Sequence, residues 1–95
     1  MAVLNLFRDR NFLGGEVVVN GDVPDLRTFG FDDVISSVIV VGGTFTLFTD
    51  KNFKGSSVTV SIHGGPGSDG RYPTPDFLGG REDTFSSVKV NSELG

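Results

Sequence analysis

Two segments of the sequence place paired carboxylates just ahead of paired serines. The first, residues 31–38, reads FDDVISSV, and the second, residues 81–88, reads REDTFSSV. Both contain two adjacent acidic residues, two spacers, two serines and a valine. Carboxylates, hydroxyls and backbone carbonyls are hard oxygen donors, which Ca²⁺ takes as ligands in proteins. The pair of segments therefore predicts calcium chemistry, whereas either one alone is equally typical of an ordinary turn capped by Asp and Ser.

The composition excludes several other kinds of site. The chain has 95 residues, no cysteine, and 12 acidic against 8 basic side chains, for a formal net charge of -4. Without cysteine it forms neither disulfides nor thiolate sites for zinc or iron–sulfur clusters. It has no basic stripe to neutralise phosphates, so nucleic acid is not an expected partner. No apolar run approaches the roughly 20 residues that cross a bilayer, so we expect no membrane insertion.

The serine segments belong to two copies of an internal repeat. FRDRNFLG, residues 7–14, aligns with FTDKNFKG, residues 48–55. The serine segments align at a larger offset, because the second copy carries extra residues in a glycine-rich loop. Such repeats indicate how the whole chain is organised. We expect one domain over residues 1–95, with a first unit at about residues 1–41 and a second at about 42–91.

Alternation of apolar and polar residues predicts strands, and no stretch shows a sustained helical period. Each copy offers about four strands: two joined by a hairpin, a short one, and one after the serines. Such a set forms a Greek key, and two units with one apolar face each pack as a β-sandwich. The predicted fold class is therefore all-β, with one short helical turn over residues 25–29. The alternating segments are residues 4–6, 17–19 and 38–40 in the first copy and 45–47, 58–60 and 88–90 in the second.

Each hairpin tip is closed by two phenylalanines, which we expect to stack across it. The glycine two residues after the second ring is expected where the backbone needs positive φ or close packing. The residues concerned are Phe7, Phe12 and Gly14 in the first copy and Phe48, Phe53 and Gly55 in the second.

With these motifs in hand, the chain resembles the βγ-crystallin family over essentially its whole length. The family signature is an aromatic, four residues, a second aromatic, one residue and glycine, as in residues 7–14 and 48–55. Calcium-binding members add Asn or Asp twice, two variable residues, Ser or Thr, and Ser, as in residues 32–37 and 82–87. The resemblance implies two Greek keys that bind two Ca²⁺ ions, each ion held by ligands from both repeats.

The resemblance also implies which residues hold the ions. The acidic pair supplies side-chain oxygens, and which carboxylate of each pair ligates is left open. The third motif position supplies a backbone carbonyl, the fifth a hydroxyl, and the residue after the first hairpin aromatic another carbonyl. The final serines, Ser37 and Ser87, are expected to bond backbone instead. The implied ligands are Arg8, Asp32, Asp33, Val34 and Ser36 in the first copy and Thr49, Glu82, Asp83, Thr84 and Ser86 in the second.

One position departs from the family pattern. Glu82 stands where members have Asn or Asp, and its extra methylene moves the carboxylate by about one bond length, which flexible calcium coordination at about 2.3–2.6 Å tolerates. Arg81 beside it competes for that carboxylate. We therefore expect two unequal sites. Ions that bind only the folded state would also stabilise this small domain.

The other classes of function open to such a chain are an enzyme and a structural or interaction module. His63 is the only histidine and lies in a glycine-rich loop. The sequence contains no G-x-S-x-G nucleophile elbow, so no catalytic triad is expected. Carboxylates adjacent in sequence do not suggest a glycosidase, and we expect no enzyme. A structural or interaction module (lens-like, adhesive, inhibitor or toxin) with weak or lost calcium binding is the alternative. No protein partner is indicated and a monomer is expected. The N-terminus shows no signal peptide, and an extracellular or cell-surface location is slightly favoured.

Overall fold

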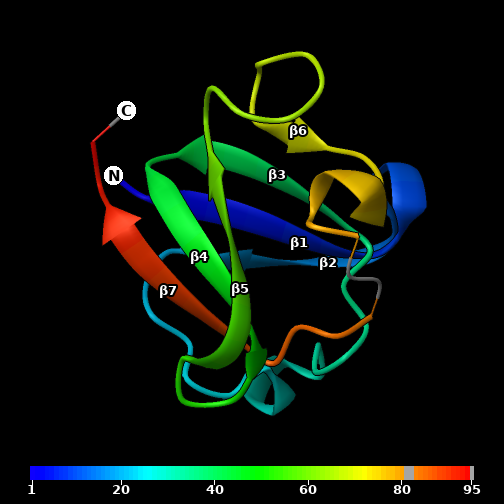
Figure 1. Cartoon of the computed structure of the whole chain (residues 1–95), viewed down its shortest axis with the longest axis vertical. Helices are drawn as coiled ribbons and strands as arrows, with labels where there is room; N and C mark the ends of the chain where they lie inside the picture. The colour runs from blue at the N-terminus through cyan, green and yellow to red at the C-terminus, as the bar shows by residue number, and fades with distance from the viewer. Residues whose placement is uncertain (81–82, 95) are drawn as a thin grey trace.

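The computed structural model describes residues 1–80 and 83–94, which form two antiparallel sheets packed face to face (Figure 1). One sheet has the order β2-β1-β3-β6 and the other β5-β4-β7. This confirms the predicted all-β sandwich. None of the helical turns in the described ranges is long or apolar enough to cross a bilayer. The strands are β1 (Val3–Asp9), β2 (Leu13–Val19), β3 (Ser37–Gly42), β4 (Thr44–Asp50), β5 (Lys54–Ser61), β6 (Arg71–Tyr72) and β7 (Ser87–Ser92), and the 3₁₀ turns are η1 (Arg10–Phe12), η2 (Leu26–Phe29) and η3 (Pro75–Phe77).

The two repeats exchange their third strands. β6 comes from the second repeat but pairs with β3 of the first, so that Tyr72 lies opposite Val38. The matching strand of the first repeat is reduced to one bridge, in which Val23 pairs with Val88 of β7. The backbone groups of Val23 and Val88 exchange two hydrogen bonds, of 2.8 and 2.9 Å. Each sheet is therefore completed by the other repeat.

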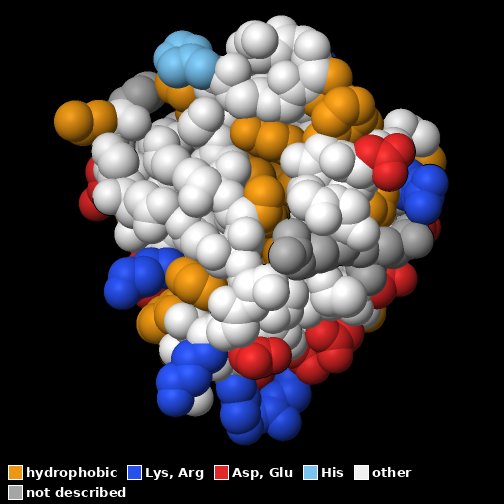
Figure 2. Space-filling view, viewed as in Figure 1, with side chains coloured by type: hydrophobic (Ala, Val, Ile, Leu, Met, Phe, Trp, Pro, Cys, Tyr) orange, Lys and Arg blue, Asp and Glu red, His pale blue; other side chains and the backbone are white. Residues whose placement is uncertain are grey.

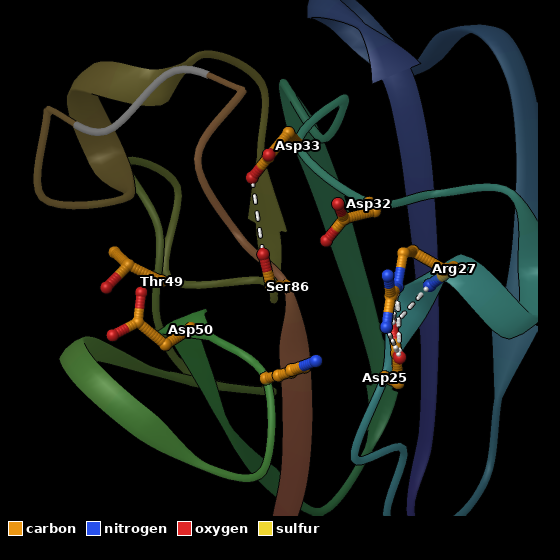
Figure 3. A pocket seen from close by; sticks show the side chains of 8 residues that line it. Asp25, Arg27, Asp32, Asp33, Thr49, Asp50 and Ser86 are labelled. Atoms are coloured by element: carbon orange, nitrogen blue, oxygen red, sulfur yellow. Dashed lines mark hydrogen bonds and ion pairs between the residues drawn. The ribbon is translucent and has the colours of Figure 1, made fainter.

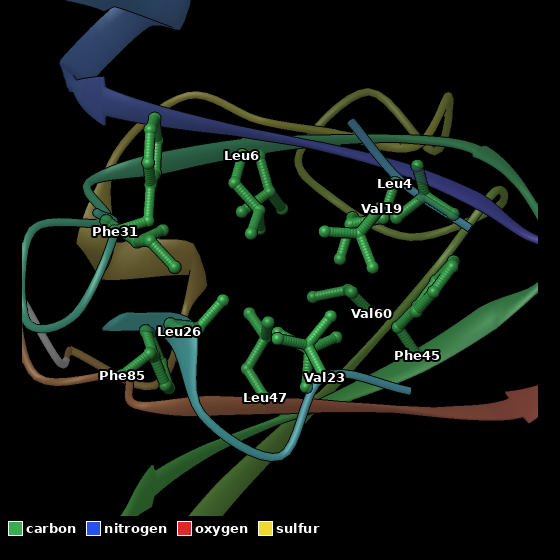
Figure 4. Close-up of a cluster of buried hydrophobic side chains, with 14 of the residues drawn as sticks. Leu4, Leu6, Val19, Val23, Leu26, Phe31, Phe45, Leu47, Val60 and Phe85 are labelled. Atoms are coloured by element: carbon green, nitrogen blue, oxygen red, sulfur yellow. The ribbon is translucent and has the colours of Figure 1, made fainter. Parts of the chain in front are cut away.

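The core lies between the sheets and is filled by the side chains that the alternation predicted (Figure 4). Leu4 and Leu6 of β1 and Phe45 and Leu47 of β4 are completely buried. Fully burying such a side chain contributes about 1.5–3 kcal/mol. Residues between the strands also join the core, and those with no exposed surface are Leu26, Ile35, Leu78 and Phe85.

The two hairpin tips have the same geometry. In each, the two phenylalanine rings meet edge to face, with centroids 5.6 Å apart in the first repeat and 6.0 Å in the second. The glycines that follow have φ near +83°, and a Cβ at either would lie within 3 Å of a side chain of the same hairpin. Both expectations are confirmed. The ring pairs are Phe7 with Phe12 and Phe48 with Phe53, and the glycines are Gly14 and Gly55.

Candidate functional site

The two serine segments meet through a pair of matching side-chain contacts. The Ser36 hydroxyl donates a hydrogen bond to Oδ1 of Asp83 over 3.0 Å. The Ser86 hydroxyl donates to Oδ1 of Asp33 over 3.2 Å, the contact drawn between these residues in Figure 3. In both pairs the hydroxyl comes from one repeat and the carboxylate from the other. The structure thus brings together four of the residues that the sequence singled out.

Backbone hydrogen bonds fix both aspartates. The N–H of Asp33 donates to the Phe85 carbonyl over 2.9 Å, and that of Asp83 donates to the Ile35 carbonyl over 3.2 Å. Asp33 has φ 57° and Asp83 has φ 55°, a left-handed conformation that Asp adopts more readily than most residues. These bonds hold Asp33 and Asp83, the second acidic residue of each motif, where each accepts from the serine of the opposite repeat.

Each serine is also tied to the hairpin of its site. The N–H of Ser36 donates to the Phe7 carbonyl over 3.0 Å, and that of Ser86 donates to the Phe48 carbonyl over 2.8 Å. These bonds bring the residue after each phenylalanine close to the serine and carboxylate pair. The residues brought there are Arg8 in one site and Thr49 in the other, both implied as carbonyl ligands.

The last serine of each motif braces a hairpin. Ser37 is fully buried, donates to the Asp9 carbonyl over 2.6 Å and accepts from the Phe12 N–H over 3.0 Å. A buried hydroxyl that both donates a hydrogen bond to the hairpin backbone and accepts one from it has a structural role. The expectation that these serines bond backbone is confirmed. Ser87 repeats the arrangement with the Asp50 carbonyl at 2.6 Å and the Phe53 N–H at 3.1 Å.

An open pocket of about 390 Å³ surrounds the contact between Ser86 and Asp33 (Figure 3). Figure 2 shows acidic and basic side chains gathered at the end of the molecule that holds η2 and the β4–β5 hairpin. Four residues implied as ligands line this pocket: Asp32, Asp33, Thr49 and Ser86. The sequence did not single out the other four, which are Asp25, Arg27, Asp50 and Lys51.

An ion pair occupies one side of this pocket. Arg27 Nη2 lies 2.6 Å from Asp25 Oδ2, and the Asp25 carboxylate also accepts from the backbone N–H of Arg27. The hydrogen bonds from Arg27 lower the pKa of Asp25 from 3.8 to about 2. The pKa of Arg27 is raised, chiefly by its hydrogen bond to Asp25, with a smaller contribution from Asp32. The available sequence signal was an Asp at the N-cap of a short helical turn, two residues before an Arg.

The remaining implied ligands do not share one common arrangement in the two repeats. The Arg8 guanidinium donates to the Gly30 carbonyl over 2.9 Å and lies 4.5 Å from the centre of the Phe31 ring, so its side chain is held by these two residues. Val34 is half-buried and Thr84 is exposed. Glu82, and Arg81 beside it, lie outside the described residues. Within the described ranges, no three His, Cys, Asp or Glu side chains gather as a group that could hold a metal ion.

Comparisons with a family model, with known sequences and with solved structures all match the chain to the same family. The family model described as Beta/Gamma crystallin matches residues 3–90. A beta/gamma-crystallin of Ciona intestinalis is 38% identical over 89 residues, which is 94% of this chain and 98% of that protein. The solved beta gamma crystallin from Ciona intestinalis superposes with a TM-score of 0.83 at 37% identity, covering 94% of this chain and 99% of that one. A betagamma-crystallin from an archaeon shares the fold at a TM-score of 0.76 and 22% identity, with 94% and 96% covered.

Proposed function

This chain belongs to the beta/gamma-crystallin family, and from that premise we propose that it is a calcium-binding domain with two Ca²⁺ sites between its repeats. The observation that carries the proposal is the matched pair of contacts from Ser36 to Asp83 and from Ser86 to Asp33. Each contact presents a hydroxyl of one repeat and a carboxylate of the other to the same point. A cation that accepts both oxygens would cross-link the repeats.

The donors at both points suit calcium. One site would use Asp33, Ser86 and the Thr49 carbonyl, with Asp32 in the same pocket. The other would use Asp83, Ser36 and the Arg8 carbonyl, and Glu82 is proposed from sequence alone. The carbonyls of Val34 and Thr84 complete the proposed set. All of these are hard oxygens, and few of them carry charge, which suits calcium at modest affinity.

Calcium would act on the fold rather than on a substrate. Binding to the folded state alone adds about 2.7 kcal/mol per site when free calcium is about 100-fold above the dissociation constant. Typical domains have only about 5–15 kcal/mol of stability, so two sites would contribute a large share. The proposal includes no catalytic step and no nucleic-acid or membrane partner.

Calorimetric titration of calcium into chelator-treated protein tests the proposal. Wild type should show two binding events, and Ser36→Ala and Ser86→Ala should each remove or weaken one of them. Ser37→Ala and Ser87→Ala are matched controls, because their hydroxyls bond hairpin backbone. They should keep both events. No heat from wild type, together with no calcium-dependent change in melting temperature, would overturn the proposal.

A further inference from the structure

The outer faces of the two sheets differ, although the repeats that form them match. On the sheet β5-β4-β7, Thr46 lies between Thr59 and Lys89, and the Thr46 and Thr59 hydroxyls are 3.2 Å apart. Figure 2 shows the surface over β4 and β5 with few hydrophobic side chains. A polar outer face is the usual condition of a sheet with one side in water.

The outer face of the sheet β2-β1-β3-β6 is aliphatic. Asn5 lies between Val18 and Ile39 in the register of the strands. Val18 is 55% exposed and Val41 is 60% exposed, while Ile39 and Val3 are half-buried. The repeat supplies a direct comparison, because the two units share one strand pattern. Val3, Val18, Ile39 and Val41 occupy the positions held in the second repeat by Thr44, Thr59, Lys89 and Asn91.

Opposite charges stand at the two edges of this face. Glu16 is on β2, two residues from Val18 and on the same side of the strand. Arg71 is on β6, in register with Ile39. β2 and β6 are the two edge strands, and both side chains are exposed. In the portion of the chain that the structure covers, neither side chain is part of an ion pair.

We propose that this face binds a second copy of the chain, sheet against sheet, about a two-fold axis. An axis parallel to the strands places β2 of one copy over β6 of its partner. The partner's Arg71 then lies over the row of Val18, two residues along β2 from Glu16, and the same arrangement recurs at the other edge. The surface is thus self-complementary in charge as well as apolar at its centre, as a two-fold interface requires. Sheets packed in this way lie about 10 Å apart.

The small area of this face limits the affinity of the proposed dimer. The whole molecule measures 27 × 25 × 22 Å, so one face buries less than the roughly 800 Å² that each partner contributes to a standard interface. The dimer should therefore form in concentrated solution and dissociate on dilution, where the monomer expected from the sequence is recovered. The proposal goes beyond calcium binding and uses none of the proposed ligands.

Analytical ultracentrifugation from about 10 µM to about 1 mM protein tests the pairing, in calcium and in chelator. Wild type should associate in both buffers. Val18→Thr with Val41→Asn, which makes this face more like that of the other sheet, should raise the dissociation constant about tenfold or more. Thr59→Ser with Asn91→Ser is the matched control on the opposite sheet and should leave association unchanged. Thermal melts should show that all variants remain folded.

Exchanging the charges of Glu16 and Arg71 tests the direction of the proposed two-fold axis. Glu16→Arg and Arg71→Glu should each weaken association, and the double variant should restore it, because the pair is re-formed with reversed signs. The wild-type pairing should also weaken in high salt. A monomer at all concentrations, an undiminished dimer in Val18→Thr/Val41→Asn, or no rescue by the double variant would each overturn the proposal. So would a monomer that floats with neutral phosphatidylcholine vesicles through the same valines, which would assign the face to lipid.

Discussion

The Ser86 hydroxyl and the Asp33 carboxylate, which come from opposite repeats, lie 3.2 Å apart at the wall of one pocket. The same two oxygens that make this hydrogen bond are the ones proposed to hold a cation. The contact therefore links the repeats in calcium-free protein, and calcium would replace one cross-link by a stronger one. Unfolding measurements with and without calcium therefore separate the stability that this hydrogen bond contributes from the stability that the bound ion would add.

Calcium should raise the melting temperature clearly, and magnesium should raise it little. Magnesium requires near-ideal octahedral geometry and dehydrates reluctantly, whereas calcium tolerates irregular sets of carbonyls, hydroxyls and carboxylates. Thermal unfolding followed by circular dichroism at matched concentrations of each ion measures the difference. Equal stabilisation by both ions would indicate general screening of the acidic surface instead of specific sites.

Ser37→Ala should destabilise the fold whether or not calcium is present. The substitution leaves the Asp9 carbonyl and the Phe12 N–H without their partner in a buried position, which costs about 1–3 kcal/mol for each unsatisfied group. Denaturant unfolding in calcium and in chelator measures the loss. Ser57→Ala, at an exposed position of β5, is the control and should change stability by less than about 0.5 kcal/mol. A loss confined to the calcium buffer would show that Ser37 acts as a ligand.

Asp33→Asn should weaken calcium binding at one site while leaving the calcium-free fold nearly unchanged. Asn adopts left-handed backbone as readily as Asp, so the φ of 57° is retained and only the charge is lost. Asp33→Ala should lose the same affinity and, in addition, about 1 kcal/mol of stability in chelator, because Ala is strained at this φ. Titration calorimetry and chelator unfolding together distinguish the variants. Equal stability of the two in chelator would contradict the backbone argument.

Arg27→Ala should return the pKa of Asp25 from about 2 toward 3.8. Because the folded-state pKa is lowered, the contribution of the ion pair is present above about pH 3.8 and is lost as the pH falls toward 2. The carboxyl carbon shift of Asp25, followed by NMR as a function of pH, measures this directly. Lys51→Ala is the matched control, since Lys51 has the smallest effect on this group and should move it less. An unchanged pKa in Arg27→Ala would show that Arg27 does not hold the carboxylate in solution.

Glu82→Asp should change the affinity of only one of the two sites. The substitution restores the side-chain length that the family pattern has at this motif position, while Asp32 already has it in the other repeat. Two-site analysis of calorimetric titrations of wild type and variant measures the change. A wild-type isotherm described by a single affinity, unaltered in the variant, would contradict the inequality of the sites.

The internal repeat made much of the fold predictable from sequence. Period-two alternation identified Leu4 and Leu6 as inward residues, and both are fully buried. The resemblance to the family also assigned Ser37 and Ser87 to backbone bonding, and both hydroxyls donate to hairpin carbonyls. Both inferences rest on patterns that recur in the two copies, in the strands and in the serine segments.

Long-range placement could not be predicted in this way. Neither Val23 nor Tyr72 carries a local sign that it pairs with the sheet of the other repeat. The sequence left open which carboxylate of each motif faces the opposite serine, and the left-handed backbone at Asp33 and Asp83 is not visible in it. The ion pair in the pocket was missed for the same reason, because its position against the serine depends on the packing of η2.

The exchanged strands also make the two repeats a single cooperative unit. A chain cut in the turn between β3 and β4 gives two fragments, and each lacks the residues that complete its own sheet. Neither fragment should fold alone, and mixing them should regenerate the native spectrum through fragment complementation. In the intact chain, heat should melt both halves in one calorimetric transition, with no state in which only one repeat is ordered.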